Sequence, residues 1–123
     1  LEGGEASNTN NTSVVSRLVF GETSFLFTGD IYQSAERALL KEGVELDSSV
    51  LKVAHHGSKT SSGEEFIDSV SPDMAVISCG KDNPYGHPHE ATLDALRETI
   101  IMRTDLLGDI KLIADGAAIR VLE

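Results

Sequence analysis

Two apolar runs near the start of the chain predict a pair of strands. The first, SVVSRLVF (13–20), mixes apolar and polar residues on its two sides. The second, SFLFT (24–28), is almost wholly apolar, which is typical of a strand buried on both faces. Gly21 and Glu22 lie between them and form a turn signal. The pattern therefore predicts a β-hairpin with a tight turn at 21–22.

The rest of the chain alternates between helical and strand patterns. Apolar residues at helical spacing predict helices over 35–42 and 89–100, and capping-box signals predict another over 63–70. Short apolar runs predict strands over 50–54 and 74–78, and a closing hairpin on either side of Gly116. The resulting order, ββαβαβαββ, indicates a mixed sheet covered by helices, the layered α/β class.

Local signals mark where some of these elements begin and end. Ser61 and Ser62 stand three residues before Glu64 and Glu65, which predicts a capping box at the start of the second helix. Residues 1–12 are small and polar and read as a flexible arm. We therefore expect one folded unit over 13–123.

Composition adds little to this picture, but the net charge of the chain narrows the range of ligands that it could bind. The formal net charge of −10 argues against this segment alone gripping a phosphate backbone, and it suits a site that holds cations. No apolar run is long enough to span a bilayer. The single cysteine, Cys79, cannot form an internal disulfide and is interpreted as a small core residue.

Three polar clusters directly follow predicted strands. They are Thr28-Gly29-Asp30, His55-His56-Gly57-Ser58 and the run from Gly80 to His89. Ligands bind at the carboxyl ends of strands in α/β sheets, so parallel strands would bring these clusters to one rim. Each cluster also has a purely structural interpretation as a turn, a strand end or a helix cap. Strand alternation further predicts that at most one of His55 and His56 points into a shared site.

The residue types favour metal chemistry if the clusters meet. Carboxylate and imidazole are ligands of zinc, manganese and iron, and Asp30 has two oxygens with which it could bridge two ions. A bound divalent ion supplies hydroxide near neutral pH. A serine hydrolase is the obvious rival, but Ser58 lacks the Gly-x-Ser-x-Gly surroundings of a nucleophile elbow.

Taken in order, three stretches resemble a known family. SVVSRLVFGETSFLFTGDI, VLKVAHHGSKTSS and ISCGKDNPYGHPHEATLDAL look like the carboxyl-terminal half of a metallo-β-lactamase-fold domain. The closest variety is the one in ComEC-type DNA-internalisation competence proteins. The resemblance implies half of an αββα sandwich, whose complete form holds two divalent metals, zinc or manganese, at one edge.

The resemblance also implies roles for individual residues. Asp30 matches the bridging, catalytic aspartate, and His55 matches a metal ligand. His56 becomes a catalytic group near the substrate, and His87 lies beside the substrate phosphate or the leaving group. Two weaker candidates for substrate contact are Ser58 and Asn83.

One part of the family pattern is missing. The first metal motif, of the His-x-His-x-Asp-His kind, has no counterpart, because no histidine precedes His55. The chain then supplies two ligands where a catalytic site usually has three from protein. We expect it to bind metal weakly, to be inactive alone, and to self-associate through an exposed apolar sheet face.

The resemblance predicts a function for the parent protein. That function is metal-dependent, nuclease-like hydrolysis of DNA during uptake, by a soluble domain of a bacterial membrane protein that does not itself contact the membrane. Which side of the membrane it occupies is left open, and DNA would be a partner through the parent. Two alternatives stay open: a small-molecule ester or lactone hydrolase on the same fold, and a non-catalytic structural or interaction domain.

Overall fold

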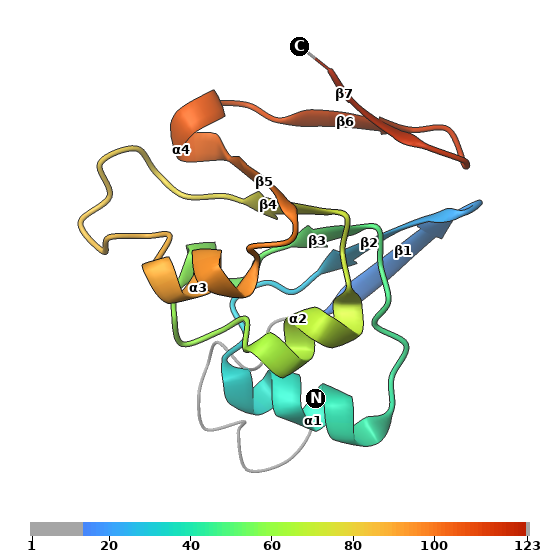
Figure 1. The fold of residues 1–123 in the computed structure, drawn as a ribbon, viewed down its shortest axis with the longest axis horizontal. Coiled ribbons are helices and arrows are strands. Elements are labelled where there is room, and N and C mark those ends of the chain that lie inside the picture. The colour runs from blue at the N-terminus through green and yellow to red at the C-terminus, as the bar shows by residue number, and fades with distance from the viewer. Residues whose placement is uncertain (1–13, 123) are drawn as a thin grey trace.

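The fold is built on a five-stranded mixed sheet, seen in a computed structural model that describes residues 14–122 (Figure 1). The strands lie in the order β1 (Ser16–Phe20), β2 (Thr23–Phe27), β3 (Val50–Lys52), β4 (Met74–Ile77) and β5 (Ile100–Arg103). β1 pairs with β2 in antiparallel fashion, and β2 to β5 are parallel. The predicted α/β class is therefore confirmed.

Helices and a second hairpin complete the described chain. The helices are α1 (Gln33–Glu42), α2 (Glu64–Val70), α3 (Glu90–Ala95) and α4 (Thr104–Leu107), and a 3₁₀ turn, η3 (Ala54–Gly57), follows β3. The predicted closing hairpin is present as β6 (Lys111–Ala114) and β7 (Ile119–Leu122). In Figure 1, α1, α2 and α3 lie on one side of the sheet, and β6 and β7 lie on the other.

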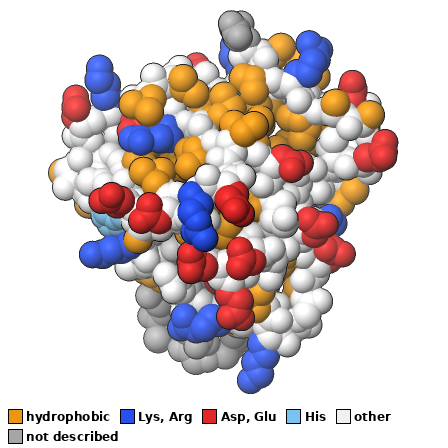
Figure 2. Space-filling model, in the orientation of Figure 1, with side chains coloured by type: hydrophobic (Ala, Val, Ile, Leu, Met, Phe, Trp, Pro, Cys, Tyr) orange, Lys and Arg blue, Asp and Glu red, His pale blue; other side chains and the backbone are white. Residues whose placement is uncertain are grey.

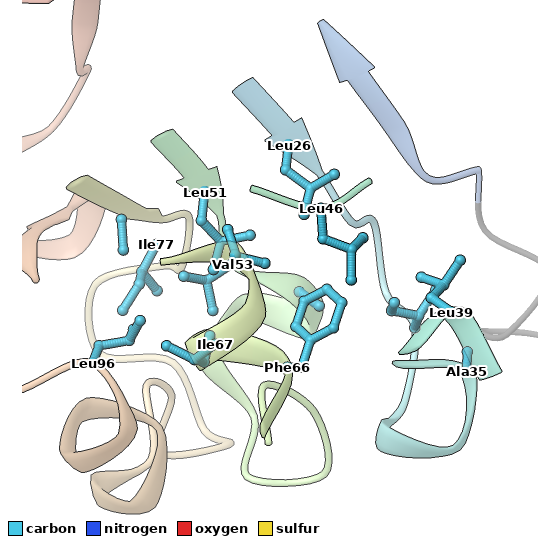
Figure 3. Close-up of a cluster of buried hydrophobic side chains, with 14 residues drawn as sticks. Leu26, Ala35, Leu39, Leu46, Leu51, Val53, Phe66, Ile67, Ile77 and Leu96 are labelled. Atoms are coloured by element: carbon cyan, nitrogen blue, oxygen red, sulfur yellow. The ribbon is translucent and has the colours of Figure 1, made fainter. Parts of the chain in front are cut away.

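The core lies between the sheet and the three helices. Leu26, Leu51 and Ala75 are aligned across β2, β3 and β4, and all three are at most 1% exposed. Phe66 and Ile67 of α2 pack into the same cluster (Figure 3). Strand alternation thus gives the helices one apolar face of the sheet to cover.

The opposite face of the sheet is covered unevenly. There the register aligns Leu18 with Phe25 and Phe25 with Val50. Val50 is 4% exposed, but Leu18 at the β1 edge is 55% exposed and Phe27 is 43% exposed. The sequence predicted that β2 is buried on both faces. The structure shows that this burial does not extend along its whole length. Figure 2 shows apolar side chains gathered on the part of the molecule where the sheet and the β6–β7 hairpin lie.

A close backbone contact joins this hairpin to the first one. The Glu22 amide donates to the Gly116 carbonyl at 2.6 Å. A Cβ at Gly21 would collide with the backbone of Gly116, and Gly21 has a φ of +61°. Glycine is required there both for the tight turn at 21–22, which is confirmed, and for the approach of the second hairpin.

The longest predicted helix is wrong in its second half. The helix predicted over 89–100 ends at Ala95, and Ile100 begins strand β5, which the sequence analysis missed. The β-branched pair Ile100-Ile101 aligns with Met74 and Ala75 of β4, so strand pairing outweighs the helical spacing of the apolar residues. The strand predicted over 50–54 likewise ends at Lys52.

The predicted capping box is also wrong. α2 begins after Gly63, and no side-chain cap bond is formed there. The Glu36 carboxylate of α1 accepts hydrogen bonds from the Ser62 and Gly63 amides instead. The arm predicted over 1–12 lies outside the described residues. None of the helices within 14–122 has the length and apolar character needed to cross a bilayer.

The exposed β1 edge predicts self-association. Leu18→Lys should weaken dimer formation about tenfold, because it places a charge on apolar surface that a second copy would cover. Sedimentation velocity over a concentration series measures this. Val44→Lys is the matched control, since Val44 is 46% exposed in the segment after α1, away from the sheet. A wild-type chain that stays monomeric at high concentration would contradict the prediction.

Candidate active site

The loops after β2, β3 and β4 carry the three polar clusters, and we call them the first, second and third loops. Direct hydrogen bonds join the first loop to the end of β3 and to the second loop, at the carboxyl edge of the parallel strands. The Thr28 hydroxyl donates to the Lys52 carbonyl at 2.7 Å, and the His55 amide donates to the Gly29 carbonyl at 2.9 Å. The loop after β4 reaches the same edge, because β3 and β4 are parallel neighbours. The three polar clusters of the sequence therefore meet at one rim.

All four histidines of the chain lie together at this rim, and we call them the histidine cluster. The ring centroids of His55, His56 and His87 form a near-equilateral triangle, with separations of 6.4 Å, 6.1 Å and 6.3 Å. The His89 ring lies 4.8 Å from that of His87. Residues from two loops thus form one group of imidazoles.

His56 is the histidine that faces Asp30. Its Nε2 lies 3.8 Å from Asp30 Oδ1, and its Nδ1 lies 2.8 Å from the Ser78 carbonyl oxygen. A carbonyl oxygen only accepts, so Nδ1 carries a hydrogen in this contact. A neutral His56 ring would then keep a lone pair on Nε2, on the side of the Asp30 carboxylate, whereas a protonated ring would donate from Nε2 to that carboxylate. Metal-binding histidines are commonly held in this way by a backbone carbonyl.

The adjacent histidines do not follow the alternation of a strand. Their backbones adopt the left-handed conformation, with φ of 53° at His55 and 55° at His56, because β3 has already ended. Both rings consequently join the cluster, and the expectation that at most one would point into a shared site is wrong. Gly57 continues the turn at a φ of 85°, and a Cβ there would collide with Pro88. Glycine thus allows the second and third loops to pack together.

His55 and Ser58 are joined through one hydroxyl. Thr60 Oγ1 lies 3.2 Å from His55 Nδ1 and 2.8 Å from Ser58 Oγ. Ser58 is only 4% exposed, and its Oγ also accepts from the Thr60 amide. The structure thus shows Ser58 in a structural network, and its predicted contact with substrate stays a prediction.

Asn83 holds the third loop in shape. Its side-chain amide donates to the carbonyls of Gly80 and His87, at 2.9 Å and 2.8 Å, and its Oδ1 accepts from the His87 amide at 2.9 Å. All of these partners lie within the loop. The predicted substrate contact of Asn83 stays a prediction beside this structural role.

The surroundings of His87 favour its neutral form. Partial burial lowers the pKa of His87, and electrostatic repulsion between its charged form and the neighbouring imidazoles of His89, His55 and His56 lowers it further. A neutral imidazole can accept a proton or bind a metal. His87 therefore lies within the histidine cluster in the neutral form, which is the form needed either to accept a proton or to bind a metal.

Both ring nitrogens of His89 are used by the protein. Nδ1 accepts from the Lys59 amide at 2.8 Å, and Nε2 lies 3.1 Å from the Tyr85 carbonyl oxygen, to which it donates. This pairing fixes the Nε2–H tautomer of a neutral ring. His89 also occupies the N-cap position of α3, where it makes no side-chain cap bond. It thus links the second and third loops.

The donor set for a metal ion is partial. Asp30 and His56 offer an oxygen and a nitrogen of the kind that zinc and manganese bind. Among residues 14–122, however, no group of three or more histidine, cysteine, aspartate and glutamate side chains is arranged to hold a metal ion. The chemistry of the pair fits a divalent ion, but the number of ligands is that of an incomplete site.

Several residues that the sequence analysis did not single out also surround the cluster. Tyr85 is 71% exposed and stacks on His87 with ring centroids 5.5 Å apart, and Tyr32 meets His55 edge-on at 5.1 Å. Burial lowers the pKa of Lys52, and the negative charge of Asp30 opposes that effect. Each lies within three residues of a candidate, and that proximity was the available signal.

The buried carboxylate of Glu36 was missed as well. Glu36 is 2% exposed, and its two oxygens accept from the Ser62 and Gly63 amides at 2.6 Å and 2.9 Å. Burial raises its pKa to about 7, although these two hydrogen bonds and the charge of Arg37 act in the opposite direction. Its place on the buried side of α1 gave no signal, because glutamate is usually exposed.

The fold and its rim define a class: a layered α/β domain with imidazole and carboxylate groups at the carboxyl edge of parallel strands. The chain is 41% identical over 112 residues to ComE operon protein 3 of Bacillus subtilis (strain 168), which covers 89% of this chain and 14% of that protein. It is 44% identical over 105 residues to Competence protein ComA of Neisseria gonorrhoeae, covering 83% and 15%. It is 35% identical over 104 residues to Recombination protein 2 of Haemophilus influenzae, covering 83% and 13%.

Over most of its length, the chain is therefore similar to one segment of ComEC-type competence proteins, as its motifs predicted. It spans 13–15% of the length of these curated relatives. No family model matches the chain, and no solved structure gives a significant match.

The raised pKa of Glu36 predicts a pH dependence of stability. Because the folded-state pKa lies above the usual 4.5, protonated Glu36 stabilises the fold. This contribution is complete below pH 4.5 and is lost as the pH rises through about 7. Relative to Glu36→Gln, the wild-type free energy of unfolding should fall by up to about 3 kcal/mol over this range. Urea titrations at several pH values measure the difference.

Glu42→Gln is the control for this measurement, because Glu42 is exposed on the same helix. Its stability curve should run parallel to that of the wild type across the range. Parallel curves for the wild type and Glu36→Gln would show instead that Glu36 does not titrate in this way.

Proposed function

We propose that this chain is the carboxyl-terminal part of a metal-dependent hydrolase that cleaves phosphodiester bonds of DNA during DNA uptake. One relative is named a competence protein and another a recombination protein, which supports a role in competence. The reaction class is inferred from the rim itself. The parent is proposed to be a bacterial membrane protein, to which this domain is attached.

The contact between His56 and Asp30 carries the proposal. His56 Nε2 and Asp30 Oδ1, which lie 3.8 Å apart, could together hold a cation when the imidazole is neutral. The Ser78 carbonyl selects the tautomer of His56 that presents a lone pair.

Asp30 and His56 are the groups that would hold the ion, and a bound divalent ion would supply hydroxide near neutral pH. The resemblance favours His55 as the ligand, and His55 stays the rival of His56. Its Nδ1 is occupied by the Thr60 hydroxyl at 3.2 Å, so His55 could bind only through Nε2.

His87 is suited to move a proton. Its lowered pKa keeps the ring neutral near pH 7, and its place between the other histidines keeps it close to the Asp30–His56 pair. A neutral imidazole accepts a proton from an attacking water and then returns one to a leaving alkoxide. Lys52, next to β3's end, adds a cation that can attract phosphate toward Asp30.

The acidic charge limits what this segment can do alone. With a net charge of −10, it needs basic surface elsewhere in the parent protein to hold DNA. The segment also covers only 13–15% of its relatives, which leaves room for the missing ligands and for such a surface. The isolated chain is therefore proposed to be inactive by itself.

A non-catalytic interaction domain is the second candidate. It is favoured by the observation that residues 14–122 offer no group of three metal ligands. Hydrolysis of a small ester or lactone on the same fold is a further variant of the first proposal, which a substrate panel on the parent protein would distinguish.

Metal titration of the chain separates these candidates. Isothermal titration with Zn²⁺ or Mn²⁺ should show weak binding, with a dissociation constant in the micromolar range or above. Asp30→Ala and His56→Ala should each weaken it at least about tenfold, since each removes one of two ligands. If His55→Ala weakens it instead of His56→Ala, the assignment based on resemblance is the correct one.

His89→Ala is the control in this series, because both nitrogens of His89 are already bonded within the protein. Its affinity for metal should stay within about twofold of the wild type. Binding that is the same in all four variants would contradict a site at the rim and favour the non-catalytic candidate.

Cleavage of DNA by the full-length parent tests the reaction. Asp30→Ala should lower the rate of cleavage at least about 100-fold, because it removes a proposed ligand and leaves His56 without its partner. Asp68→Ala, at an exposed position of α2, is the matched control and should keep full activity. Equal rates of DNA cleavage for the wild type and Asp30→Ala would contradict the proposed mechanism.

A further inference from the structure

Residues 58–63, which we call the site loop, orient two members of the histidine cluster. The Thr60 hydroxyl contacts His55 Nδ1 at 3.2 Å, and the Lys59 amide donates to His89 Nδ1 at 2.8 Å. A shift of the loop would therefore change the orientation of both His55 and His89. What fixes the loop thus also fixes the two imidazoles.

On the side away from the histidines, the site loop is held by α1 and the residues just before it. The Gln33 amide donates to the Thr60 carbonyl at 2.9 Å, and the Gln33 side chain donates to the Lys59 carbonyl at 3.1 Å. The Ser61 hydroxyl donates to the Ile31 carbonyl. These contacts fix the first part of the loop.

The second part of the site loop is held by Glu36. Both oxygens of this carboxylate are used, one by the Ser62 amide and one by the Gly63 amide. Ser62 has a φ of +58°, a conformation that costs energy for a residue with a Cβ and persists only where its surroundings enforce it. The hydrogen bonds from the Ser62 and Gly63 amides to Glu36 hold Ser62 in this conformation.

We propose that Glu36 is a positioning residue of the candidate site and acts through the site loop. Its carboxylate fixes the loop, and the loop in turn orients His55 and His89. The purpose of that orientation rests on the proposed hydrolase, but the positioning itself is a property of the fold. The two oxygens of Glu36 offer one acceptor to each amide, whereas the side-chain amide of a glutamine presents an NH₂ donor to one of them.

The burial of a carboxylate argues against a purely stabilising role. Burial disfavours its charged form, so a residue selected only for stability would be apolar or neutral here. The charged groups around it do not change this conclusion: Arg37 of α1 favours the anion, and Glu64 and Glu65 of α2 line the same pocket. The carboxylate is retained at a cost in stability, which the positioning of the loop explains.

Histidine ring spectra of this chain test the proposal without any assay of activity. In Glu36→Gln, the long-range ¹H–¹⁵N signals of His55 and His89 should move, and His89 should lose its single Nε2–H tautomer. The signal of His56 should change least, because its Nδ1 is held by Ser78 and not by the site loop. Amide exchange at Lys59, Ser62 and Gly63 should accelerate about tenfold, the factor expected for loss of one ordinary hydrogen bond.

Two further variants make the result specific. Thr60→Ala removes only the contact to His55, so it should move the His55 signal and leave the His89 tautomer in place. Glu42→Gln, on the exposed side of α1, should move neither. If Glu36→Gln does not fold, Glu36→Asp carries the test, because the shorter side chain keeps the charge and cannot reach both amides; the same two signals should then move.

A folded Glu36→Gln or Glu36→Asp chain with unchanged His55 and His89 signals would overturn the positioning role and leave the hydrolase proposal intact. A parent protein that cleaves no DNA, together with shifted histidine signals, would do the reverse. The two proposals therefore fail in distinguishable ways.

Discussion

The hydrogen bond from the His55 amide to the Gly29 carbonyl is the contact on which the candidate site depends. At 2.9 Å it joins the loop after β3 to the loop after β2, at the point where the chain leaves the sheet. It also accompanies two successive left-handed residues, each of which costs about 1–2 kcal/mol without glycine. The Ser58 amide, which donates to the His55 carbonyl at 2.9 Å, closes the turn. These bonds offset the strain and place both imidazoles beside His87, with His56 facing Asp30.

Much of the fold could be predicted because its elements are local. The hairpin with its turn at Gly21, the helix ending at Gly43 and the closing hairpin all follow from short-range patterns, and the structure contains them. The strand at Ile100 could not be predicted, because its place is decided by pairing with β4, a contact between segments far apart in sequence. The predicted capping box at the start of α2 was wrong for a similar reason. The carboxylate that accepts from the Ser62 amide belongs to Glu36, which lies on another helix.

The candidate site shows the same division. The meeting of Asp30 with the histidines could be expected, since parallel strands bring their carboxyl ends to one edge. The way each ring points could not, because it depends on backbone φ values at His55 and His56 and on a carbonyl supplied by Ser78. The assignment of His55 or His56 as ligand is the point at which motif and geometry diverge. Resemblance favours the first, and the contact with Asp30 favours the second.

The direct test of this account is the position of a bound metal. A crystal of this chain soaked in Mn²⁺ or Zn²⁺, measured at the absorption edge of the ion, locates it by anomalous scattering. The account predicts a peak about 2.0–2.2 Å from both His56 Nε2 and Asp30. Such a peak would be lost in Asp30→Ala. A peak away from the rim, or none at the rim when the ion is bound elsewhere, would contradict it.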